Sequence, residues 1–420
     1  MDNTDRKYPS YGLLGRRLPY SFSPRIHGLL GNKEYGLIEL SEEELPGFME
    51  EKAFSGINVT IPYKQAVIPY LDELSDEARE IGAVNTIVRL QDGRLFGDNT
   101  DIFGMEYLLG SADIDLRGKH VLILGSGGTS LTARALCRKA GAASAKVVSR
   151  KGSLNYDNVS ERKETEVIIN TTPVGTFPGN GESPIDISIF PELYAVVDVI
   201  YNPRRTELIM DAEKAGLRTA SGLRMLIAQA VRAHELFFGK QVETSAVEDI
   251  YRILKNDLMN INIIGMPGCG KTTVARELSL LCGKAFLDSD IFVENDAGMS
   301  IPEIFAEYGE TYFRELETEA VKELGKMTGT VIATGGGVVL REENMRALHQ
   351  NGPVIFLERE LSELGREGRP LSGSLDDLRR IYDTRIEKYR GYADFIFTNE
   401  DEPRLVAERI WKKLYEAPDY

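Results

Sequence analysis

Residues 265–272 read GMPGCGKT, a glycine loop that ends in a lysine and a threonine. A loop with this spacing offers backbone N–H groups to nucleotide phosphates, the lysine reaches the terminal phosphates, and the hydroxyl binds Mg²⁺. A tight glycine turn alone would not require Lys271 and Thr272 at these positions. We therefore predict an ATP-Mg²⁺ site with the binding residues Met266, Gly268, Cys269, Gly270, Lys271, Thr272 and Thr273.

Carboxylates and arginines downstream of this loop indicate a small acceptor. Asp288 and Asp290 follow an apolar run, and alternate strand residues share a face, so we expect both carboxylates to point the same way. One would support the metal ion while the other contacts a hydroxyl nucleophile. A bare glycine backbone lets a ligand approach closely. An acceptor with an anionic group and hydroxyls would suit the set Arg314, Arg369, Arg385, Gly335, Gly336 and Gly337.

A second glycine loop, G-x-G-G-x-S from Gly125 to Ser130, lies between an apolar run and a helical segment. This context indicates a dinucleotide-binding fold. At the end of the next strand, an NAD site would have an acidic residue for the ribose 2′-hydroxyl. Arg150 and Lys151 stand there instead, and their positive charges suit a 2′-phosphate. The alternative is that both are solvated surface charges. We predict NADP(H), bound by Gly125, Ser126, Gly127, Gly128, Ser149, Arg150 and Lys151.

Lys64 and Asp101 are candidates for acid–base chemistry. A lysine held by a carboxylate can donate a proton when a carbonyl is reduced to an alkoxide. The sequence alone does not show that the two side chains meet, and a surface position is the alternative for Lys64.

The elements that must position these residues are short apolar runs alternating with helical segments. Continuous apolar runs are typical of strands buried on both faces of a parallel sheet. We expect strands at Val121–Gly125, Lys146–Arg150, Glu166–Asn170, Ala195–Asn202, Ile261–Gly265, Val331–Thr334 and Val354–Glu358. The fold class is α/β with more than one sheet. An amphipathic helix ending near Leu258 predicts a unit boundary at about residues 255–260.

Composition bounds the class of protein. The 420 residues suffice for two or three domains of about 150 residues. A net charge of −15 opposes binding to nucleic acid or an anionic membrane. Cys137, Cys269 and Cys282 form no C-x-x-C pair, and the N-terminus is polar, so we expect a cytoplasmic protein without disulfides or a signal peptide. The oligomeric state, monomer or homodimer, stays open.

Residues 260–415 resemble shikimate kinase. The resemblance rests on GMPGCGKTT, FLDSD, GMSIPEIFAEYGETYFRELE, ATGGGVV, RPL and RIEKYRGYAD, in that order. It implies that Asp290 binds the ring hydroxyls and is a candidate proton acceptor, while Asp288 holds Mg²⁺ through water. It further implies that Arg314 and Arg385 clamp a carboxylate, that Gly335–Gly337 line the pocket, and that Arg369 is a lid arginine reaching the transferred phosphate.

Residues 8–255 resemble shikimate dehydrogenase through YSFSPRIH, GINVTIPYK, GAVNTI, GDNTD, GSGG, INTTPVG, DVIYNPRRTEL and GLRMLIAQA. The resemblance implies Lys64 and Asp101 as the catalytic pair. Ser21 and Ser23 would bind the substrate carboxylate. The ring hydroxyls would contact Thr60, Asn85, Asp101 and Gln229, with Tyr201 nearby. Asn170, Thr171 and Gly222 would border NADPH, and Ser149 stands where an asparagine is usual.

The two resemblances imply three segments. Residues 1–103 would form a substrate lobe, completed by helices in about 222–256; 104–221 a Rossmann-like NADP lobe; and 257–420 a P-loop kinase domain with a parallel sheet flanked by helices. The implied function is bifunctional: reduction of 3-dehydroshikimate by NADPH, then phosphorylation of shikimate by ATP. The alternatives are a dehydrogenase that also takes quinate, a regulatory sensor of pathway intermediates with reduced catalysis, and a scaffold for other enzymes.

Overall fold

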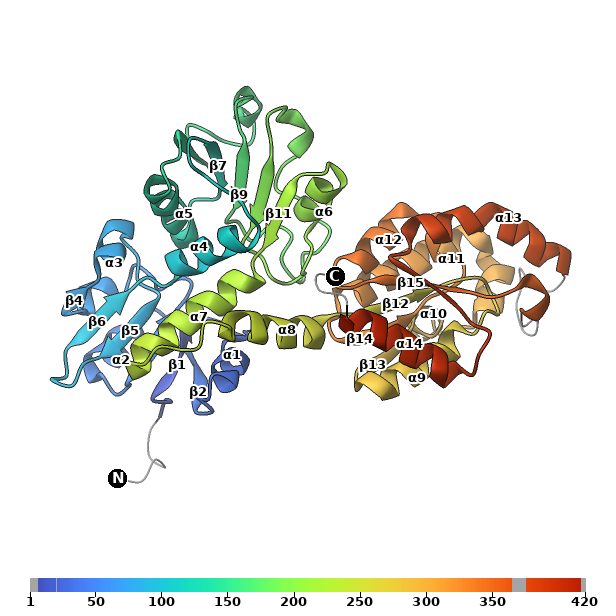
Figure 1. The fold of residues 1–420 in the computed structure, drawn as a ribbon, viewed down its shortest axis with the longest axis horizontal. Coiled ribbons are helices and arrows are strands. Elements are labelled where there is room, and N and C mark those ends of the chain that lie inside the picture. The colour runs from blue at the N-terminus through green and yellow to red at the C-terminus, as the bar shows by residue number, and fades with distance from the viewer. Residues whose placement is uncertain (1–6, 20, 365–374, 417–420) are drawn as a thin grey trace. The chain divides into compact units, whose positions relative to one another are not determined.

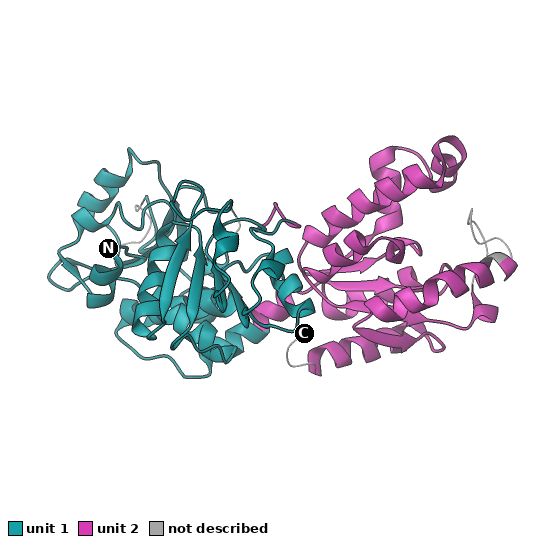
Figure 2. Cartoon of the chain, turned by 90° about the horizontal axis from the view of Figure 1, so that it is seen from above, with its two compact units in different colours: residues 1–176, 182–252 teal, residues 177–181, 253–420 magenta. Residues whose placement is uncertain are grey.

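The computed structural model describes residues 7–19, 21–364 and 375–416. It divides into two compact units (Figure 2). Unit 1 comprises residues 1–176 and 182–252, and unit 2 comprises residues 177–181 and 253–420. The division at residues 252 and 253 falls inside helix α8 (Ala246–Leu258), the amphipathic helix that the sequence predicts. Arg369 lies outside the described residues.

The first sheet of unit 1 has six strands in the order β2-β1-β3-β5-β6-β4. Its apolar face packs on a core that includes Leu14, Ile38, Phe54 and Ile87. The sheet is mixed, because β5 runs antiparallel to both β3 and β6. Its elements are β1 (Tyr11–Gly15), α1 (Ser23–Leu29), β2 (Tyr35–Glu39), α2 (Leu45–Glu51), β3 (Gly56–Val59), β4 (Glu73–Leu74), α3 (Asp76–Ile81), β5 (Thr86–Arg89) and β6 (Leu95–Asp98).

The second sheet of unit 1 is parallel throughout, in the order β11-β10-β9-β7-β8. Helices α4 and α5 cover one face, and α6 covers the other (Figure 1). The strand order reverses between β7 and β9, which places a ligand crevice at the carboxyl ends of these strands. The elements are α4 (Asp101–Ser111), β7 (His120–Leu124), α5 (Gly128–Lys139), β8 (Ser144–Val148), β9 (Val167–Asn170), β10 (Ala195–Asp198), α6 (Glu207–Lys214), β11 (Arg218–Ser221) and α7 (Leu223–Phe238).

The strand expected to run to Asn202 ends at Asp198 instead. Asp198 is fully buried, and its carboxylate accepts hydrogen bonds from the Ile200 N–H at 3.0 Å and the Thr206 hydroxyl at 2.7 Å. Thr206 in turn caps helix α6 by accepting from the Ile209 N–H. The hydrogen bonds of the Asp198 side chain thus replace those between strands, and the chain turns towards α6. An apolar run in the sequence does not reveal this turn.

Unit 2 contains one parallel sheet in the order β13-β14-β12-β15-β16. Helices α9 and α14 pack together on one face, and α11 and α12 pack together on the other (Figure 1). The elements are β12 (Ile261–Ile264), α9 (Lys271–Cys282), β13 (Ala285–Asp288), α10 (Ser289–Ala297), α11 (Ile301–Lys326), β14 (Thr330–Ala333), α12 (Glu342–His349), β15 (Val354–Glu358), α13 (Leu375–Tyr392), β16 (Phe395–Thr398) and α14 (Pro403–Glu416).

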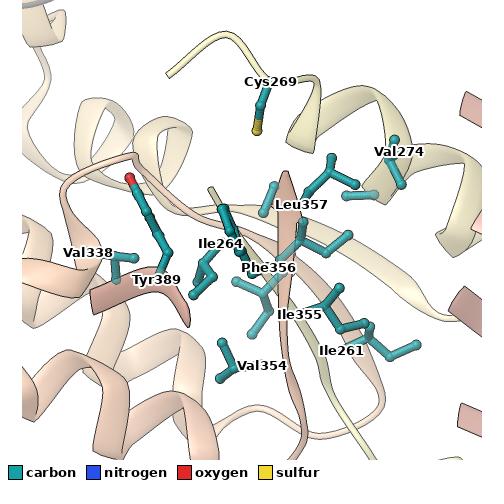
Figure 3. Close-up of a cluster of buried hydrophobic side chains, with 14 of the residues drawn as sticks. Ile261, Ile264, Cys269, Val274, Val338, Val354, Ile355, Phe356, Leu357 and Tyr389 are labelled. Atoms are coloured by element: carbon teal, nitrogen blue, oxygen red, sulfur yellow. The ribbon is translucent and has the colours of Figure 1, made fainter. Parts of the chain in front are cut away.

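The central strands of this sheet are buried on both faces, as their apolar runs predict. Side chains of β12 and β15 fill the core, where the Tyr389 ring stacks on Phe356 with centroids 5.2 Å apart (Figure 3). Cys269 lies in the loop beyond the end of β12. This packing gives the glycine loop after β12 a rigid base.

Helix α11 contains a break at Gly309, whose φ of 80° and ψ of 177° are not helical. A residue with a Cβ rarely adopts this conformation, so the glycine permits the change of direction. The part that follows the break carries Arg314 and Glu317. Across the described residues, no helix combines the length and apolar character needed to cross a membrane.

Candidate active sites

A cavity of about 190 Å³ in unit 1 lies between the first sheet and the carboxyl end of the second. It brings together eight residues predicted to bind or transform the substrate and one predicted to border NADPH. The eight are Ser21, Ser23, Thr60, Lys64, Asn85, Asp101, Tyr201 and Gln229, and the ninth is Gly222.

Lys64 and Asp101 meet in this cavity. The Lys64 Nζ donates to Asp101 Oδ2 at 2.5 Å, and the two side chains are only 14% and 9% exposed. Asp101 is the first residue of α4, where the helix dipole favours a negative charge. An ammonium held beside a cavity by an ionised carboxylate can deliver a proton to a reacting oxygen. The contact that the sequence alone could not establish is therefore present.

Asn85 fixes the other oxygen of this carboxylate. Its Nδ2 donates to Asp101 Oδ1 at 2.8 Å, while its Oδ1 accepts from the Thr100 N–H at 2.7 Å. The amide therefore has a defined orientation. Lys64 and Asn85 hold the Asp101 carboxylate, and the Asp101 backbone N–H donates to Asn99 Oδ1. This arrangement orients the carboxylate before any substrate enters.

Sequence reasoning missed Asn58, which also lines the cavity. Its Nδ2 donates to the Asn85 carbonyl and to the Thr86 hydroxyl. Asn58 and Thr60 alternate in the run GINVT, and alternation places both side chains on one face. This alternation with Thr60 could have identified Asn58 as a residue of the cavity. Other unpredicted lining residues are Leu13, Val59, Thr129, Val199, Met225 and Leu226.

The predicted dinucleotide loop lies beside Lys64. Gly125 has a φ of +98°, and a Cβ there would meet Thr171 at 3.0 Å. Gly128 begins helix α5, and a Cβ on it would stand 3.5 Å from Lys64 Cδ. A helix N-terminus preceded by an open glycine loop is suited to a pyrophosphate. The residues present thus fit NADP(H), with Lys64 adjacent to the loop.

The cations predicted to face a 2′-phosphate follow strand β8. Arg150 and Lys151 are exposed, and Ser149 is half-buried. The side chains of Asn170 and Thr171, predicted to border NADPH, already have hydrogen-bond partners within the protein. The Asn170 amide donates to Asp198 and accepts from Thr172, and the Thr171 hydroxyl donates to the Leu124 carbonyl. These two side chains hold the loop that borders the crevice.

A second cavity, of about 550 Å³, lies in unit 2 at the carboxyl ends of β12, β13 and β14. It is lined by most of the residues predicted for the nucleotide and its acceptor: Gly268, Gly270, Lys271, Thr272, Thr273, Asp290, Arg314, Gly335, Gly336, Gly337 and Arg385. Met266 and Cys269 are buried, so we expect them to contribute through their main chain.

Lys271 is folded across the glycine loop. Its Nζ donates to the Gly265 carbonyl at 2.9 Å and to the Met266 carbonyl at 3.0 Å, and the residue is 8% exposed. Gly268 and Gly270 have positive φ values of 84° and 95°. These left-handed positions shape the loop and favour glycine.

The two aspartates of FLDSD do not share a strand face, contrary to the expectation. Strand β13 ends at Asp288, and Asp290 belongs to helix α10. Asp288 caps that helix by accepting from the Asp290 N–H at 3.0 Å, and this cap ends the strand. The carboxylates consequently separate into two positions with different neighbours.

Asp288 lies beside the Thr272 hydroxyl, which donates to its Oδ2 at 3.0 Å. A hydroxyl and a carboxylate suit Mg²⁺, which completes its shell with water and phosphate oxygens. The described residues contain no cluster of three or more acidic, histidine or cysteine side chains able to hold a metal ion by themselves. The residues present therefore fit a metal ion that binds together with a nucleotide.

Asp290 faces the cavity. Burial, together with the nearby charges of Asp288 and Glu317, raises the pKa of its carboxyl to about 6. A Cβ on Gly335 would stand 2.5 Å from Asp290 Oδ1 and 2.7 Å from Glu317 Oε1. The absence of a side chain at Gly335 therefore makes room for both carboxylates. A carboxylate with a raised pKa beside a cavity can accept a proton from a hydroxyl.

Arg314 and Arg385 bring positive charge to the same cavity. Arg314 Nη1 donates to Glu317 Oε2 at 2.7 Å, and Arg385 Nη1 donates to the Gly336 carbonyl at 2.8 Å. Both arginines are 8% exposed. Glu317 was not predicted, although it stands three residues after Arg314 on a helix, a spacing at which side chains meet. Asn399, which contacts the glycine loop, was also missed.

The fold and the two cavities define a two-lobed dinucleotide-dependent dehydrogenase followed by a P-loop phosphotransferase. Residues 13–87 match the family model of the shikimate dehydrogenase substrate binding domain, and residues 267–415 match that of shikimate kinase. An NADP(+) shikimate dehydrogenase from Clostridium beijerinckii is 35% identical over 267 residues, covering 59% of this chain and 98% of the relative. One from Pelodictyon phaeoclathratiforme is 38% identical, covering 57% and 94%.

Solved structures agree. Shikimate dehydrogenase 1 from Peptoclostridium difficile has 35% identity and a TM-score of 0.55, covering 58% of this chain and 97% of its own. Shikimate 5-dehydrogenase from Thermus thermophilus, solved with NADP(H) and shikimate, has 33% identity and a TM-score of 0.52, covering 58% and 98%. The chain belongs to the shikimate dehydrogenase family and also carries a shikimate kinase domain.

Proposed function

We propose that the chain catalyses two consecutive reactions of the shikimate pathway. In unit 1, 3-dehydroshikimate is reduced to shikimate with NADPH. In unit 2, shikimate is phosphorylated by ATP with Mg²⁺ to shikimate 3-phosphate. The observation that carries the first reaction is the Lys64–Asp101 contact beside the glycine loop, within the fold of the NADP(+)-dependent relatives. The second reaction rests on the acceptor cavity beside Lys271 and Thr272.

For the reduction, Lys64 supplies the proton to the oxygen of the ring ketone. Asp101 holds the ammonium in place, and Asn85 holds Asp101. NADPH supplies the hydride when it is bound. Ser21 and Ser23 offer hydroxyls to the substrate carboxylate, and Thr60 and Gln229 offer polar groups to the ring hydroxyls. The two charged side chains are nearly enclosed, so water screens their attraction only weakly.

For the phosphorylation, Asp290 accepts the proton of the attacking hydroxyl. Arg314 and Arg385 bind the carboxylate of shikimate, and Gly335–Gly337 let the ring approach the backbone. Lys271 stabilises the terminal phosphates, and Mg²⁺ at Thr272 and Asp288 would neutralise the phosphate charge. Arg369, predicted to reach the transferred phosphate, stays a prediction.

Both cavities are equipped for the same small molecule. Each offers groups for one carboxylate and several hydroxyls, as expected for enzymes whose product and substrate coincide. A sensor with reduced catalysis would have no need for the Lys64–Asp101 contact, which argues for turnover. A dehydrogenase that also accepts quinate is the second candidate. Quinate has an extra ring hydroxyl near the carboxylate, and Ser21 and Ser23 favour shikimate without deciding between the two.

We further propose a cytoplasmic location, supported by free Cys137, Cys269 and Cys282, of which the first two are buried. The partners are small molecules and not nucleic acid, in line with the net charge of −15. The assembly state, monomer or homodimer, is to be measured directly.

One reaction tests the proposal. Purified protein is mixed with 3-dehydroshikimate, NADPH, ATP and Mg²⁺, NADPH absorbance is followed, and products are identified by mass spectrometry. We expect NADPH loss with shikimate 3-phosphate appearing. Product that stops at shikimate would reject the kinase half, and absence of turnover with retained ligand binding would favour the sensor. Quinate with NADP⁺ in a second reaction tests the alternative substrate.

A further inference from the structure

Asn399 follows strand β16 and touches the glycine loop of unit 2. It is 5% exposed, and its Nδ2 donates to the Cys269 carbonyl at 2.6 Å. Its own backbone N–H donates to the Glu358 carbonyl at 2.8 Å, which ties it to the end of β15. The side chain thus connects the carboxyl edge of the sheet to a loop that lies 130 residues earlier in the sequence.

The hydrogen bond from Asn399 controls the direction of a neighbouring N–H group. The Cys269 carbonyl and the Gly270 N–H belong to one planar trans peptide, so they point in opposite directions. Gly270 lines the cavity, whereas Asn399, which binds the Cys269 carbonyl, lies outside the cavity lining, so we take this carbonyl to face away from the cavity. The Gly270 N–H is therefore aimed at the cavity.

The adjoining peptides have other restraints. The Cys269 N–H donates to the Met266 carbonyl at 3.2 Å, and the Gly270 carbonyl accepts from the Val274 N–H at 3.0 Å, in the first turn of α9. The 269–270 peptide between them is held by Asn399. Glycine gives this position little intrinsic stiffness, and Gly270 has a φ of +95°. Asn399 also packs tightly here, because a Cβ on Gly270 would stand 2.5 Å from its Nδ2.

We infer that Asn399 is a positioning residue for phosphate binding: it fixes the Gly270 N–H towards the nucleotide phosphates before the nucleotide arrives. The inference rests on the proposed kinase function of unit 2. Backbone donors that are aimed in advance bind anionic oxygens without a reorganisation cost. Without the amide, the peptide is free to rotate and the donor is lost for part of the time.

The test compares Asn399→Leu, which keeps the branched shape of the side chain but cannot donate, with the unchanged chain. Isothermal titration measures the affinity for inorganic tripolyphosphate with Mg²⁺ and, separately, for adenosine, and kinetics give the KM for ATP. The dehydrogenase activity of the same chain is the internal control. Asn351→Leu is the matched control, because Asn351 is 2% exposed and donates to the Gly325 carbonyl at 3.0 Å, before the start of β15.

We expect Asn399→Leu to weaken tripolyphosphate binding and raise the KM for ATP by about tenfold, with adenosine binding and dehydrogenase activity unchanged. A tripolyphosphate affinity within about twofold of the unchanged chain would overturn the inference. So would an equal loss in Asn351→Leu, or a loss confined to adenosine. If the unchanged chain binds no tripolyphosphate, the kinase proposal fails and the inference with it.

A second variant guards against misfolding of unit 2. Asn399→Ser is smaller than the native side chain, and its hydroxyl is too short to replace the amide contact. We expect the same selective loss of tripolyphosphate affinity. Full affinity in this variant would contradict the positioning role.

Discussion

Lys64 and Asp101 are 37 residues apart in the sequence and 2.5 Å apart in the cavity of unit 1. We predict that Lys64→Ala lowers kcat for the reduction about 10²- to 10⁴-fold, because the proton donor is removed. The kinase rate of the same chain should not change. Separate assays with 3-dehydroshikimate and NADPH, and with shikimate and ATP, measure the two effects. Loss of both activities would contradict independent sites.

Arg150 provides a test of cofactor preference. The residue is exposed after β8, where it is available to a 2′-phosphate. We predict that Arg150→Ala raises the KM for NADPH about tenfold while the KM for NADH changes little, because only NADPH has the added phosphate. Steady-state kinetics with both cofactors give the ratio. An unchanged ratio would place the 2′-phosphate against other residues.

Asp290 should give the kinase a dependence on pH. Its carboxyl has a pKa of about 6, raised by burial and by neighbouring carboxylates, and it accepts a proton only when ionised. We predict that kcat/KM of the kinase falls as the pH is lowered through about 6. Rates measured across this range, with the dehydrogenase as a stability control, check the prediction. A flat profile would remove Asp290 from the role of base.

The same carboxyl affects stability in the opposite sense. The folded pKa of Asp290 is above its ordinary value of 3.8, so the native state binds the proton more tightly than the unfolded chain. The resulting stabilisation is full below pH 3.8 and is lost as the pH rises through about 6, by up to about 3 kcal/mol. At neutral pH the ionised form that the reaction needs therefore lowers the free energy of unfolding.

The resemblance to known families predicts most residues that line the two cavities. It does not predict which side chains orient those lining residues. Asn85 is named as a substrate ligand, whereas the structure also shows it orienting Asp101. Glu317 ends the motif GMSIPEIFAEYGETYFRELE, but the resemblance assigns it no role, and Asn399 lies outside every quoted motif. Their roles depend on contacts in the folded chain. Glu317 contacts Arg314, three residues away in the sequence, and Asn399 contacts Cys269, 130 residues away.

At the scale of elements, the glycine segment 335–337 determines the shape of the acceptor cavity. A Cβ on Gly337 would stand only 1.8 Å from Arg314 Nη1. We predict that Gly337→Ala leaves the fold intact, because the guanidinium can move, but raises the KM for shikimate about tenfold by displacing that clamp. The KM for ATP should stay constant. Kinase kinetics in both substrates, with a thermal melt, distinguish displacement from unfolding.

Strands of the two parallel sheets were predictable because burial on both faces leaves continuous apolar runs. The failures come from polar side chains that end elements early. Asp198 closes β10 and Asp288 closes β13, each by accepting a backbone N–H two residues onward. The mixed first sheet was not predicted either, since its antiparallel pairing depends on contacts between strands and not on the composition of any one.

At the scale of the whole molecule, the fusion places two successive reactions in one chain. We predict that a mixture of the Lys64→Ala and Lys271→Ala variants converts 3-dehydroshikimate into shikimate 3-phosphate, because released shikimate diffuses between molecules. A coupled assay that follows both products should show a lag that shortens as protein concentration rises. Alone, Lys271→Ala should stop at shikimate, and Lys64→Ala should leave 3-dehydroshikimate unconverted. Absence of product from the mixture would indicate that the intermediate is not released.

Lys271 already has partners in the glycine loop, because its ammonium donates to two backbone carbonyls. An arriving anion must therefore compete for this charge, and binding is an exchange of partners. The two carbonyls present only partial negative charges to the ammonium, whereas a polyphosphate presents several full ones, so a polyphosphate can win the exchange. A weakly charged anion such as chloride has much less to offer. We therefore expect the loop to select anions of high charge density, before any base or sugar is recognised.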